Sequence, residues 1–541
     1  MMSIFRRHST APPAAEPEPD PEPDAATPAP APQSAPGRRL PVIYVRGFAG
    51  GAKGIDKQVD DPFYGFNDGS THIRVGGDGT PQYYQFESPL LRLFAADGYQ
   101  PLVSGDPKAY LESQQPQSVP PETLWIHRFY DSAADTFGKG AAEFNIERAA
   151  EDLYDLVELV RSRTGAPKVF LVAHSMGGLV CRSMIQKISY LPKDGVPRTP
   201  GKDLVDKLFT YGTPHGGITF EVGGGLLDEA MEVLGPVGSD IFSPELMYGY
   251  LWRDAHWGEE APDGWRPTEI PPDEFPADRI FCLIGTDPAD YGLSRKVVGP
   301  RSDGLVAIEN AYVRGAHRAF VHRSHSGRYG LVNSEEGYQN LRRFLFGKVK
   351  VEVALTGLDP VPAAAADGAV WQAEVQLSVR GLPVVLDEQL AAHYCPVQLS
   401  GRQDQAAPVP LADVFLLDPA TREGSSTVAP STVCRYALHL RVMRLEERHG
   451  LLFWRDHLAQ AADWDDILVV DVGRLASDPP EAMLAWAAWN SMLPGAIADY
   501  STVGTQPLAT QQGTVSIPLP LSAAKLLGDQ AALRLSFSHW S

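Results

Sequence analysis

The sequence predicts an α/β protein: a mostly parallel sheet flanked by helices, with a disordered tail before it and an antiparallel β-sandwich-like domain after it. Three observations lead to this prediction. Apolar runs of strand length alternate with amphipathic helical stretches across residues 39–347. From residue 348 to 541 the apolar residues instead recur at every second position, which is typical of strands with one buried face. Residues 1–38 are dominated by Pro, Ala and acidic residues and offer little to bury, so we expect them to be disordered.

Length and composition set the broad class. A chain of 541 residues has room for two or three domains and a full core. The formal net charge of −20 argues against binding to nucleic acid or to an anionic membrane surface. The four cysteines, Cys181, Cys282, Cys395 and Cys434, are too scattered for a disulfide framework or a zinc knuckle.

The sequence shows no segment for targeting or for spanning a membrane. The N-terminal residues lack an apolar run long enough for a signal peptide, and no stretch reaches transmembrane length. We therefore expect a cytoplasmic protein. Export by a route that uses no cleavable signal stays open.

The first expected strand, Leu40–Val45, ends in the glycine-rich turn Arg46–Gly51. The glycine spacing fits neither a P-loop nor a dinucleotide-binding fingerprint. In an acyl-transfer enzyme, a turn in this place supplies the second backbone donor of the oxyanion hole. Phe48 is our candidate for that N–H group.

Residues 52–122 are unusually long for one connection, which indicates a functional loop or an inserted subdomain. His72 lies there, and we expect a structural role for it. Residues 123–130 then predict a strand. Residues 141–162 predict an amphipathic helix with one apolar stripe. Strands and helices that alternate at this spacing predict right-handed crossovers and a parallel sheet.

The stretch that carries the chemistry begins with the buried strand Val169–Ala173 and ends in a helix over 178–187. Ser175 lies at the turn between them. A strand-turn-helix with small residues two before and two after a serine, here Ala173 and Gly177, is the context of a strained nucleophile turn. The alternative is a chance pentapeptide in a Gly- and Ala-rich chain.

The strand expected over Val205–Tyr211 closes on Gly212-Thr-Pro-His-Gly-Gly217. His215 precedes every acid candidate in the chain, so we expect it to border the pocket without acting as the base. Residues 218–275 interrupt the alternation and carry apolar and aromatic side chains. We interpret them as a lid or acyl-binding cap; an ordinary helical excursion packed on the core is the alternative.

Two aspartates follow the strand expected over Arg279–Ile284. Asp303 lies in Ser-Asp-Gly-Leu-Val, where a turn can direct the carboxylate toward the carboxyl edge of the sheet. Asp287 lies in Asp-Pro-Ala-Asp, which is more typical of a solvated turn. We therefore favour Asp303 as the acid.

Two histidines follow the last expected strand, Ala319–Val321. His325 lies further into a Gly- and Ser-containing turn and has more freedom to reach the serine, whereas His322 is closer to the strand. We favour His325 and keep His322 as the alternative. A helix is expected over 334–346, with Ser334 as its N-cap.

These motifs, in this order, resemble the α/β-hydrolase superfamily and, within it, the bacterial lipase and esterase branch. They are Val-Ala-His-Ser175-Met-Gly-Gly, Gly212-Thr-Pro-His-Gly-Gly, Ser-Asp303-Gly-Leu-Val and Ser-His325-Ser. The resemblance covers roughly residues 40–347. The chain differs from the family pattern at Ala173, at Arg46 and in the 52–122 insertion, and these differences bear on the substrate more than on the chemistry.

The resemblance implies carboxylic ester hydrolysis on an ester or lipid-like acyl substrate. In that chemistry Ser175 attacks the acyl carbon, His325 takes and returns the proton, and Asp303 fixes the tautomer of the imidazole. The backbone amides of Phe48 and Met176 would bind the oxyanion. No metal or organic cofactor is implied, and the sequence holds no ligand cluster at metal spacing.

The second domain, 348–541, is expected to be a β-rich accessory domain with five clear alternating segments: 348–353, 371–377, 436–442, 515–517 and 533–537. One helix is expected to interrupt it, from Pro480 to Leu493, apolar nearly all round and either buried between domains or docking a lipid or partner.

Two other functions stay open at this point. The same three residues could transfer an acyl group to an alcohol or amine instead of water. A binding or scaffold protein on an inactive hydrolase fold is the alternative without catalysis. The full set of serine, acid, histidine and both glycine turns counts against the scaffold, because nothing structural requires all of them.

Overall fold

The structure is a computed structural model. It describes residues 39–47, 70–75, 81–86, 88–101, 106–129, 145–218, 241–289, 298–327, 329–359, 370–400, 407–417, 433–445, 462–473, 484–501, 507–508 and 513–541. The expected tail at 1–38, Phe48 and the apolar patch Leu226–Leu234 lie outside the described residues. Arg39–Ser541 form one compact unit.

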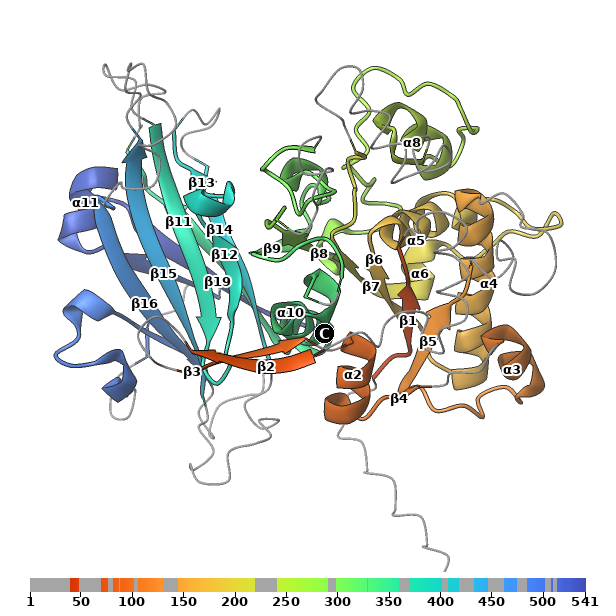
Figure 1. The fold of residues 1–541 in the computed structure, drawn as a ribbon, viewed down its shortest axis with the longest axis horizontal. Coiled ribbons are helices and arrows are strands. Elements are labelled where there is room, and N and C mark those ends of the chain that lie inside the picture. Colours follow the sequence, from red (N-terminus) through yellow and green to blue (C-terminus); the bar gives the residue numbers. More distant parts are fainter. Residues whose placement is uncertain are drawn as a thin grey trace, which may run out of the picture. The chain divides into compact units, whose positions relative to one another are not determined.

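Within the described residues, the first part of this unit holds a seven-stranded parallel sheet in the order β4-β5-β1-β6-β7-β8-β9 (Figure 1). The strands are β1 (Val42–Val45), β4 (Gln100–Pro101), β5 (Thr123–His127), β6 (Val169–His174), β7 (Val205–Tyr211), β8 (Ile280–Gly285) and β9 (His317–Val321). β1, β6 and β8 are buried along their whole length, as expected for a parallel sheet covered on both faces. The predicted α/β class is therefore confirmed.

Helices cover this sheet in two groups. They are α2 (Pro89–Asp97), α3 (Pro107–Ser113), α4 (Ile146–Thr164), α5 (Met176–Gln186), α6 (Gly201–Leu204), α8 (Pro244–Leu251) and α10 (Glu335–Phe346). α2 packs against α10, whereas α3, α4 and α5 pack together, and Figure 1 shows the strands between the two groups. Ser334 caps α10 as predicted, because its hydroxyl accepts a hydrogen bond from the amide of Gly337 at 3.0 Å.

The long connection expected over 52–122 contains secondary structure of its own. β2 (Ser70–Val75) pairs antiparallel with β3 (Pro81–Phe86), and α2, β4 and α3 follow in the same stretch. His72 lies in β2. This stretch therefore also supplies an edge strand, β4, to the main sheet.

The second part of the unit is built from two antiparallel sheets. One has the order β14-β10-β19-β18, and the other has the order β12-β11-β15-β16-β17, with β13 paired to β11. The strands are β10 (Val349–Thr356), β11 (Val370–Val379), β12 (Val385–Gln389), β13 (Val397–Gln398), β14 (Val409–Leu416), β15 (Val433–Leu445), β16 (Trp464–Gly473), β17 (Leu484–Trp489), β18 (Thr514–Pro518) and β19 (Ala532–His539). Val351 and Leu535 from the first sheet share one hydrophobic core with Leu377 and Leu440 from the second. Alternating burial along the strands confirms the predicted β-sandwich-like part.

The helix predicted from Pro480 to Leu493 is wrong. Within the described residues this segment forms β17, followed by a short 3₁₀ turn at Asn490–Met492. Pairing with β16 overrides the helix preference of its Ala, Leu and Met residues, because Trp489 packs edge-on against Trp464 and its indole donates to the carbonyl of Pro518. Met492 is 69% exposed and does not form part of the predicted apolar helix surface.

The two parts of the unit contact each other through buried polar groups. The imidazole of His317 in β9 lies 2.7 Å from a carboxylate oxygen of Asp413 in β14. The amide of Phe320 donates to Asp387 in β12 at 2.8 Å, and the indole of Trp540 donates to the carbonyl of Phe344 in α10 at 2.7 Å. The domain boundary expected at residue 347 stays a prediction.

Asp387 makes this contact sensitive to pH. Burial raises the pKa of Asp387 to about 7 from its ordinary 3.8. Between about pH 4 and 7, Asp387 therefore stays protonated in the folded state but is ionised in the unfolded state. As the pH rises through that window, the free energy of unfolding decreases, because only the unfolded state releases the proton. We expect Asp387→Asn, relative to wild type, to gain stability between pH 5 and pH 8, by at most about 3 kcal/mol. Urea unfolding at both pH values measures this gain. The exposed Asp529→Asn is the control, and an equal effect of both variants at the two pH values would contradict the prediction.

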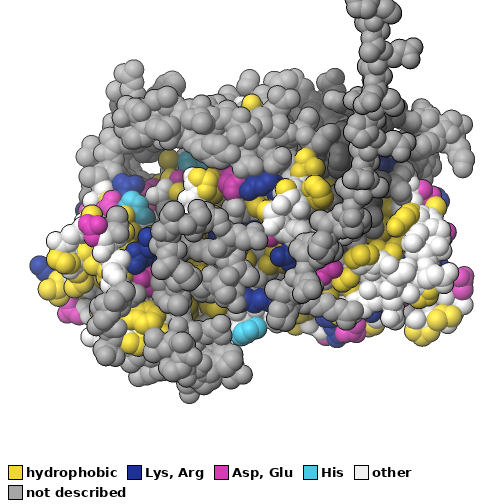
Figure 2. Space-filling view, turned by 90° about the horizontal axis from the view of Figure 1, so that it is seen from below, with side chains coloured by type: hydrophobic (Ala, Val, Ile, Leu, Met, Phe, Trp, Pro, Cys, Tyr) yellow, Lys and Arg dark blue, Asp and Glu magenta, His cyan; other side chains and the backbone are white. Residues whose placement is uncertain are grey.

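The surface of the described residues is mixed. On the face drawn in Figure 2, acidic and basic side chains lie interspersed among apolar and polar ones. Of the helices that the structure describes, none is long and apolar enough to cross a lipid bilayer.

Candidate active site

The site begins at a strained serine between β6 and α5. Ser175 has φ 53° and ψ −128°, a left-handed value that a side chain rarely adopts. Its amide donates to the carbonyl of Tyr211 at 2.9 Å, and its carbonyl accepts from the hydroxyl of Thr213 at 2.8 Å. Neighbouring strands therefore hold the turn that aims the serine hydroxyl away from the sheet.

Close packing around the turn explains its small residues. A Cβ atom on Gly177 would lie 2.2 Å from the carbonyl oxygen of Val45. A Cβ atom on Gly47 would lie 2.6 Å from the Cβ of Ser175. The end of β1 and the serine turn are thus in direct contact, which only glycine permits at these two positions.

The structure brings Ser175, His325 and Asp303 together in one hydrogen-bonded chain. Nε2 of His325 lies 2.9 Å from Oγ of Ser175, and Nδ1 of His325 lies 2.8 Å from Oδ2 of Asp303. Ser175 and His325 follow the carboxyl ends of β6 and β9, and Asp303 lies in the connection between β8 and β9. All three side chains are almost fully buried. With the Nδ1 proton directed at the carboxylate, Nε2 is left as an acceptor for the serine hydroxyl.

Asp303 is itself held in place on its other oxygen. Oδ1 accepts hydrogen bonds from the amides of Leu305 and Val306 at 3.0 and 2.8 Å. The amide of His325 donates to the carbonyl of Asp303 at 2.9 Å, which joins the two loops. The acid therefore meets the imidazole through Oδ2.

Two glycines at strand ends leave room for this pair. A Cβ atom on Gly212, which follows β7, would lie 3.0 Å from Oδ2 of Asp303 and 3.1 Å from Nδ1 of His325. On Gly285, the last residue of β8, it would lie 2.7 Å from the Cβ of Asp303. Glycine occupies both positions because the acid and the imidazole lie directly against them.

His174 is a residue of the site that the sequence did not single out. Its Nε2 lies 2.9 Å from the carbonyl oxygen of His325, and the two rings are 5.0 Å apart. Burial, and then the charge of His325, lower the pKa of His174 well below its ordinary range, so it stays neutral. A neutral His174 can donate to that carbonyl and hold the histidine loop over the serine turn.

The other candidates lie elsewhere. His322 is 44% exposed and stacks on His393 with ring centroids 3.9 Å apart. Asp287 accepts from the amide of Ala289 at 2.8 Å in a local turn. Neither His322 nor Asp287 has a hydrogen bond to Ser175 among the described residues.

His215 is fully buried, and its Nε2 lies 3.1 Å from the hydroxyl of Thr210. Burial and the charge of Arg182 lower the pKa of His215 well below its ordinary range. It lies in the loop that follows β7, and its predicted place beside the pocket stays a prediction.

Of the two expected oxyanion donors, Met176 is described and Phe48 lies outside the described residues. Met176 is the first residue of α5, where a helix leaves its amides without an intrahelical acceptor. In the described residues no group of three or more His, Cys, Asp and Glu side chains is arranged to hold a metal ion.

No family model and no curated protein matches the sequence. Solved structures do match. A mature lipase from Bacillus licheniformis is 14% identical, with 59% of this chain and 94% of the lipase covered and a TM-score of 0.30. A phospholipase from Legionella pneumophila is 10% identical, with 78% of this chain and 91% of that chain covered, at a TM-score of 0.30. Lipase B from Aspergillus fumigatus is 12% identical, with 53% and 45% covered, at a TM-score of 0.24.

The fold follows from the chain's own geometry. Seven parallel strands run with helices on both faces, and a strained serine turn joins β6 to α5. The acid and the histidine follow on later strands in the order Ser, Asp, His. The described part of the chain from β1 to α10 has an α/β-hydrolase fold.

Proposed function

We propose that this protein is a serine-dependent carboxylic ester hydrolase that works through an acyl-enzyme on Ser175. The observation that supports the proposal is the hydrogen-bonded chain from Oγ of Ser175 through His325 to Asp303, at 2.9 and 2.8 Å. A serine hydroxyl is a weak nucleophile unless an oriented base removes its proton. This chain supplies the base and the group that orients it.

In the proposed reaction, Oγ of Ser175 attacks the acyl carbon while Nε2 of His325 takes the hydroxyl proton. Asp303 stabilises the imidazolium and holds the Nδ1 proton. Collapse of the tetrahedral intermediate breaks the ester bond, and the leaving alkoxide takes the proton from Nε2. Water then attacks the acyl-enzyme by the same route and releases the acid and the free serine.

The negative charge that develops on the carbonyl oxygen needs fixed donors. We propose the amides of Met176 and Phe48 for this role. Met176 fits it because its N–H lies at the N-terminus of α5, where the helix dipole also favours negative charge.

The proposed substrate is an ester with an apolar acyl chain. α8 packs against α5, the helix that begins next to Ser175. Lys187, just past the end of α5, donates to the carbonyls of Gly249 and Ala255 at 2.5 and 2.7 Å, which ties the α8 region to it. We propose that the aromatic side chains of this region form a cap over the acyl chain.

The test is covalent labelling. Because Ser175 is only 4% exposed, both a small organophosphorus fluoridate and a long-chain fluorophosphonate are used. We expect a single adduct at Ser175 by mass spectrometry. Ser175→Ala abolishes it, and His325→Ala slows it by at least roughly 10³-fold, because the hydroxyl then has no base.

His322→Ala is the matched control and is expected to label at the wild-type rate. Labelling that survives His325→Ala but not His322→Ala would identify His322 as the base. The absence of labelling by both reagents, in protein that unfolds cooperatively, would overturn the proposal in favour of a non-catalytic scaffold. Turnover of nitrophenyl esters with and without an added alcohol then separates hydrolysis from acyl transfer.

A further inference from the structure

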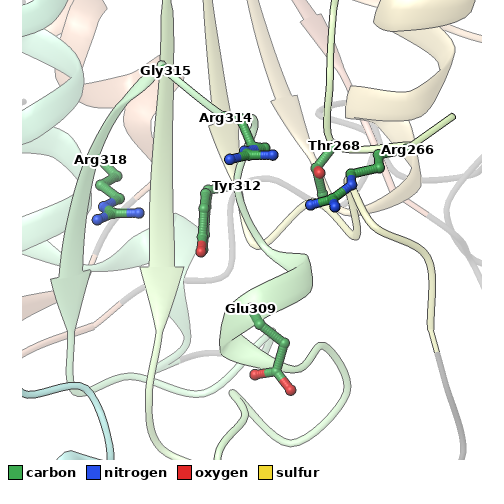
Figure 3. Close-up of a pocket in the computed structure, with 7 residues that line it drawn as sticks. All are labelled: Arg266, Thr268, Glu309, Tyr312, Arg314, Gly315 and Arg318. Carbon is green, nitrogen blue, oxygen red and sulfur yellow. The ribbon is translucent and has the colours of Figure 1, made fainter. Parts of the chain in front are cut away.

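Arginines gather around a second cavity, away from Ser175. The cavity has a volume of about 450 Å³ and lies between the segment 266–268 and the segment 309–318 that leads into β9. We call it the arginine pocket. Its lining residues are Arg266, Thr268, Glu309, Tyr312, Arg314, Gly315 and Arg318 (Figure 3).

The guanidinium groups of this pocket are only weakly engaged. Arg314 pairs with Glu269 at 2.8 Å, but both side chains are about half exposed, and such a pair contributes little. Arg318 lies over the ring of Tyr312 at 4.7 Å, which leaves its N–H edge for another partner. Among the described residues, the side chains of Arg266 and Arg318 have no hydrogen bond and no ion pair within 4 Å, although the charge of Arg318 acts on the buried carboxyl group of Asp387.

Figure 3 shows how these groups are placed. Arg266 and Thr268 lie on one side, Arg318 lies on the other, and Tyr312 and Arg314 lie between them. Glu309 lies on the short helix at the far end. Three arginines against one glutamate give the lining a formal charge of +2, in a chain whose net charge is −20. A local cluster of positive charge is not expected from the acidic composition of the whole chain.

The arginine pocket is separate from the candidate active site. Arg314 and Gly315 precede β9 and Arg318 is its second residue, whereas His325 follows the other end of β9. The end of the pocket near Arg314 and Arg318 therefore lies toward the start of β9, whereas Glu309 lies next to Asn310, whose carbonyl accepts from the amide of Gly216 in the loop after β7.

We propose that the arginine pocket binds a phosphate group carried by a small molecule or a lipid headgroup. Guanidinium groups match phosphate oxygens in bidentate geometry, and three of them with two hydroxyls offer more donors than the two oxygens of a carboxylate accept. The lining charge of +2, or +1 when Glu269 beside Arg314 is counted, also favours a phosphate monoester, which carries about −1.5 to −2 at neutral pH. The cavity is larger than a phosphate, and its remaining volume accommodates the group that bears it.

The experiment measures binding of inorganic phosphate to the full chain by titration calorimetry. A parallel flotation assay uses phosphatidylcholine vesicles with or without phosphatidic acid. The test variant is Arg266→Gln/Arg318→Gln. The control is Arg148→Gln/Lys525→Gln, which removes the same two charges from exposed positions outside the pocket. Thermal unfolding of both variants checks that the fold is retained.

We expect the pocket variant to bind at least about tenfold more weakly than wild type, and the control within about twofold, because each lost guanidinium removes charge-assisted hydrogen bonds. Binding of inorganic phosphate identifies a soluble ligand. Binding only to vesicles with phosphatidic acid identifies a lipid headgroup. No binding of either probe, or equal losses in the pocket and control variants, would overturn the proposal. The Arg266→Lys/Arg318→Lys variant, which keeps the charge, is expected to retain part of the affinity.

Discussion

Asp303→Asn is expected to lower kcat/KM for an activated ester by roughly 10³- to 10⁴-fold while leaving the fold intact. The reason lies in the two oxygens of Asp303. Oδ1 accepts hydrogen bonds from the amides of Leu305 and Val306, so in the variant this position must keep the amide oxygen. The NH₂ group is then placed where Oδ2 meets Nδ1 of His325.

An amide NH₂ in that place is a donor and forces Nδ1 to accept. The imidazole then carries its proton on Nε2, the atom that lies 2.9 Å from Oγ of Ser175, and cannot take the serine proton. Burial of the pair at 1% and 3% exposure leaves no room for water to restore the tautomer. Activity is therefore lost because the imidazole of His325 has the wrong tautomer, and no movement of the backbone is needed.

Steady-state hydrolysis of a nitrophenyl ester across pH 6–9 measures this loss, with the rate of fluorophosphonate labelling as a second readout. Asp287→Asn is the control, since its carboxylate caps a local turn at Ala289, and we expect less than a twofold change. A loss of similar size in both variants, or none in Asp303→Asn, would remove Asp303 from the proposed machinery.

The sequence was sufficient to predict the main sheet apart from its edge strand β4, and the three polar side chains at its edge. Ser175 and His325 follow β6 and β9, Asp303 lies in the connection after β8, and in a parallel sheet those strand ends meet at one edge. The choice of Asp303 over Asp287 came from local turn chemistry, and the structure now places Asp303 against the histidine. Local signals sufficed because Ser175 and His325 are positioned by the strands that they follow and Asp303 by its own turn.

Features that depend on contacts between distant segments could not be predicted. His174 acts on the carbonyl of His325, a residue 151 positions away, and its own segment gives no sign of that contact. The arginine pocket joins two segments whose arginines are unremarkable in sequence. The expected helix over 480–493 failed for the same reason, because pairing with β16 decides the conformation of β17.

Gly177→Ala is expected to lower the free energy of unfolding by about 3 kcal/mol or more. The added Cβ would lie 2.2 Å from the carbonyl oxygen of Val45 and 2.5 Å from that of Arg46. Both are backbone atoms at the end of β1, a central strand paired on both sides, so they cannot move without disturbing the sheet. The strain falls on the turn that already holds Ser175 at φ 53°.

Urea unfolding measures this destabilisation, and the labelling rate at Ser175 shows whether the turn still presents its hydroxyl. Gly495→Ala is the control: its Cβ would meet no atom within 4 Å, so we expect stability within about 0.5 kcal/mol of wild type. Wild-type stability in Gly177→Ala would show that β1 and the serine turn are not in the contact described here. Loss of labelling with little loss of stability would instead show that the serine turn changes its conformation while the sheet keeps its own. The added Cβ would then disturb the active site and leave the core intact.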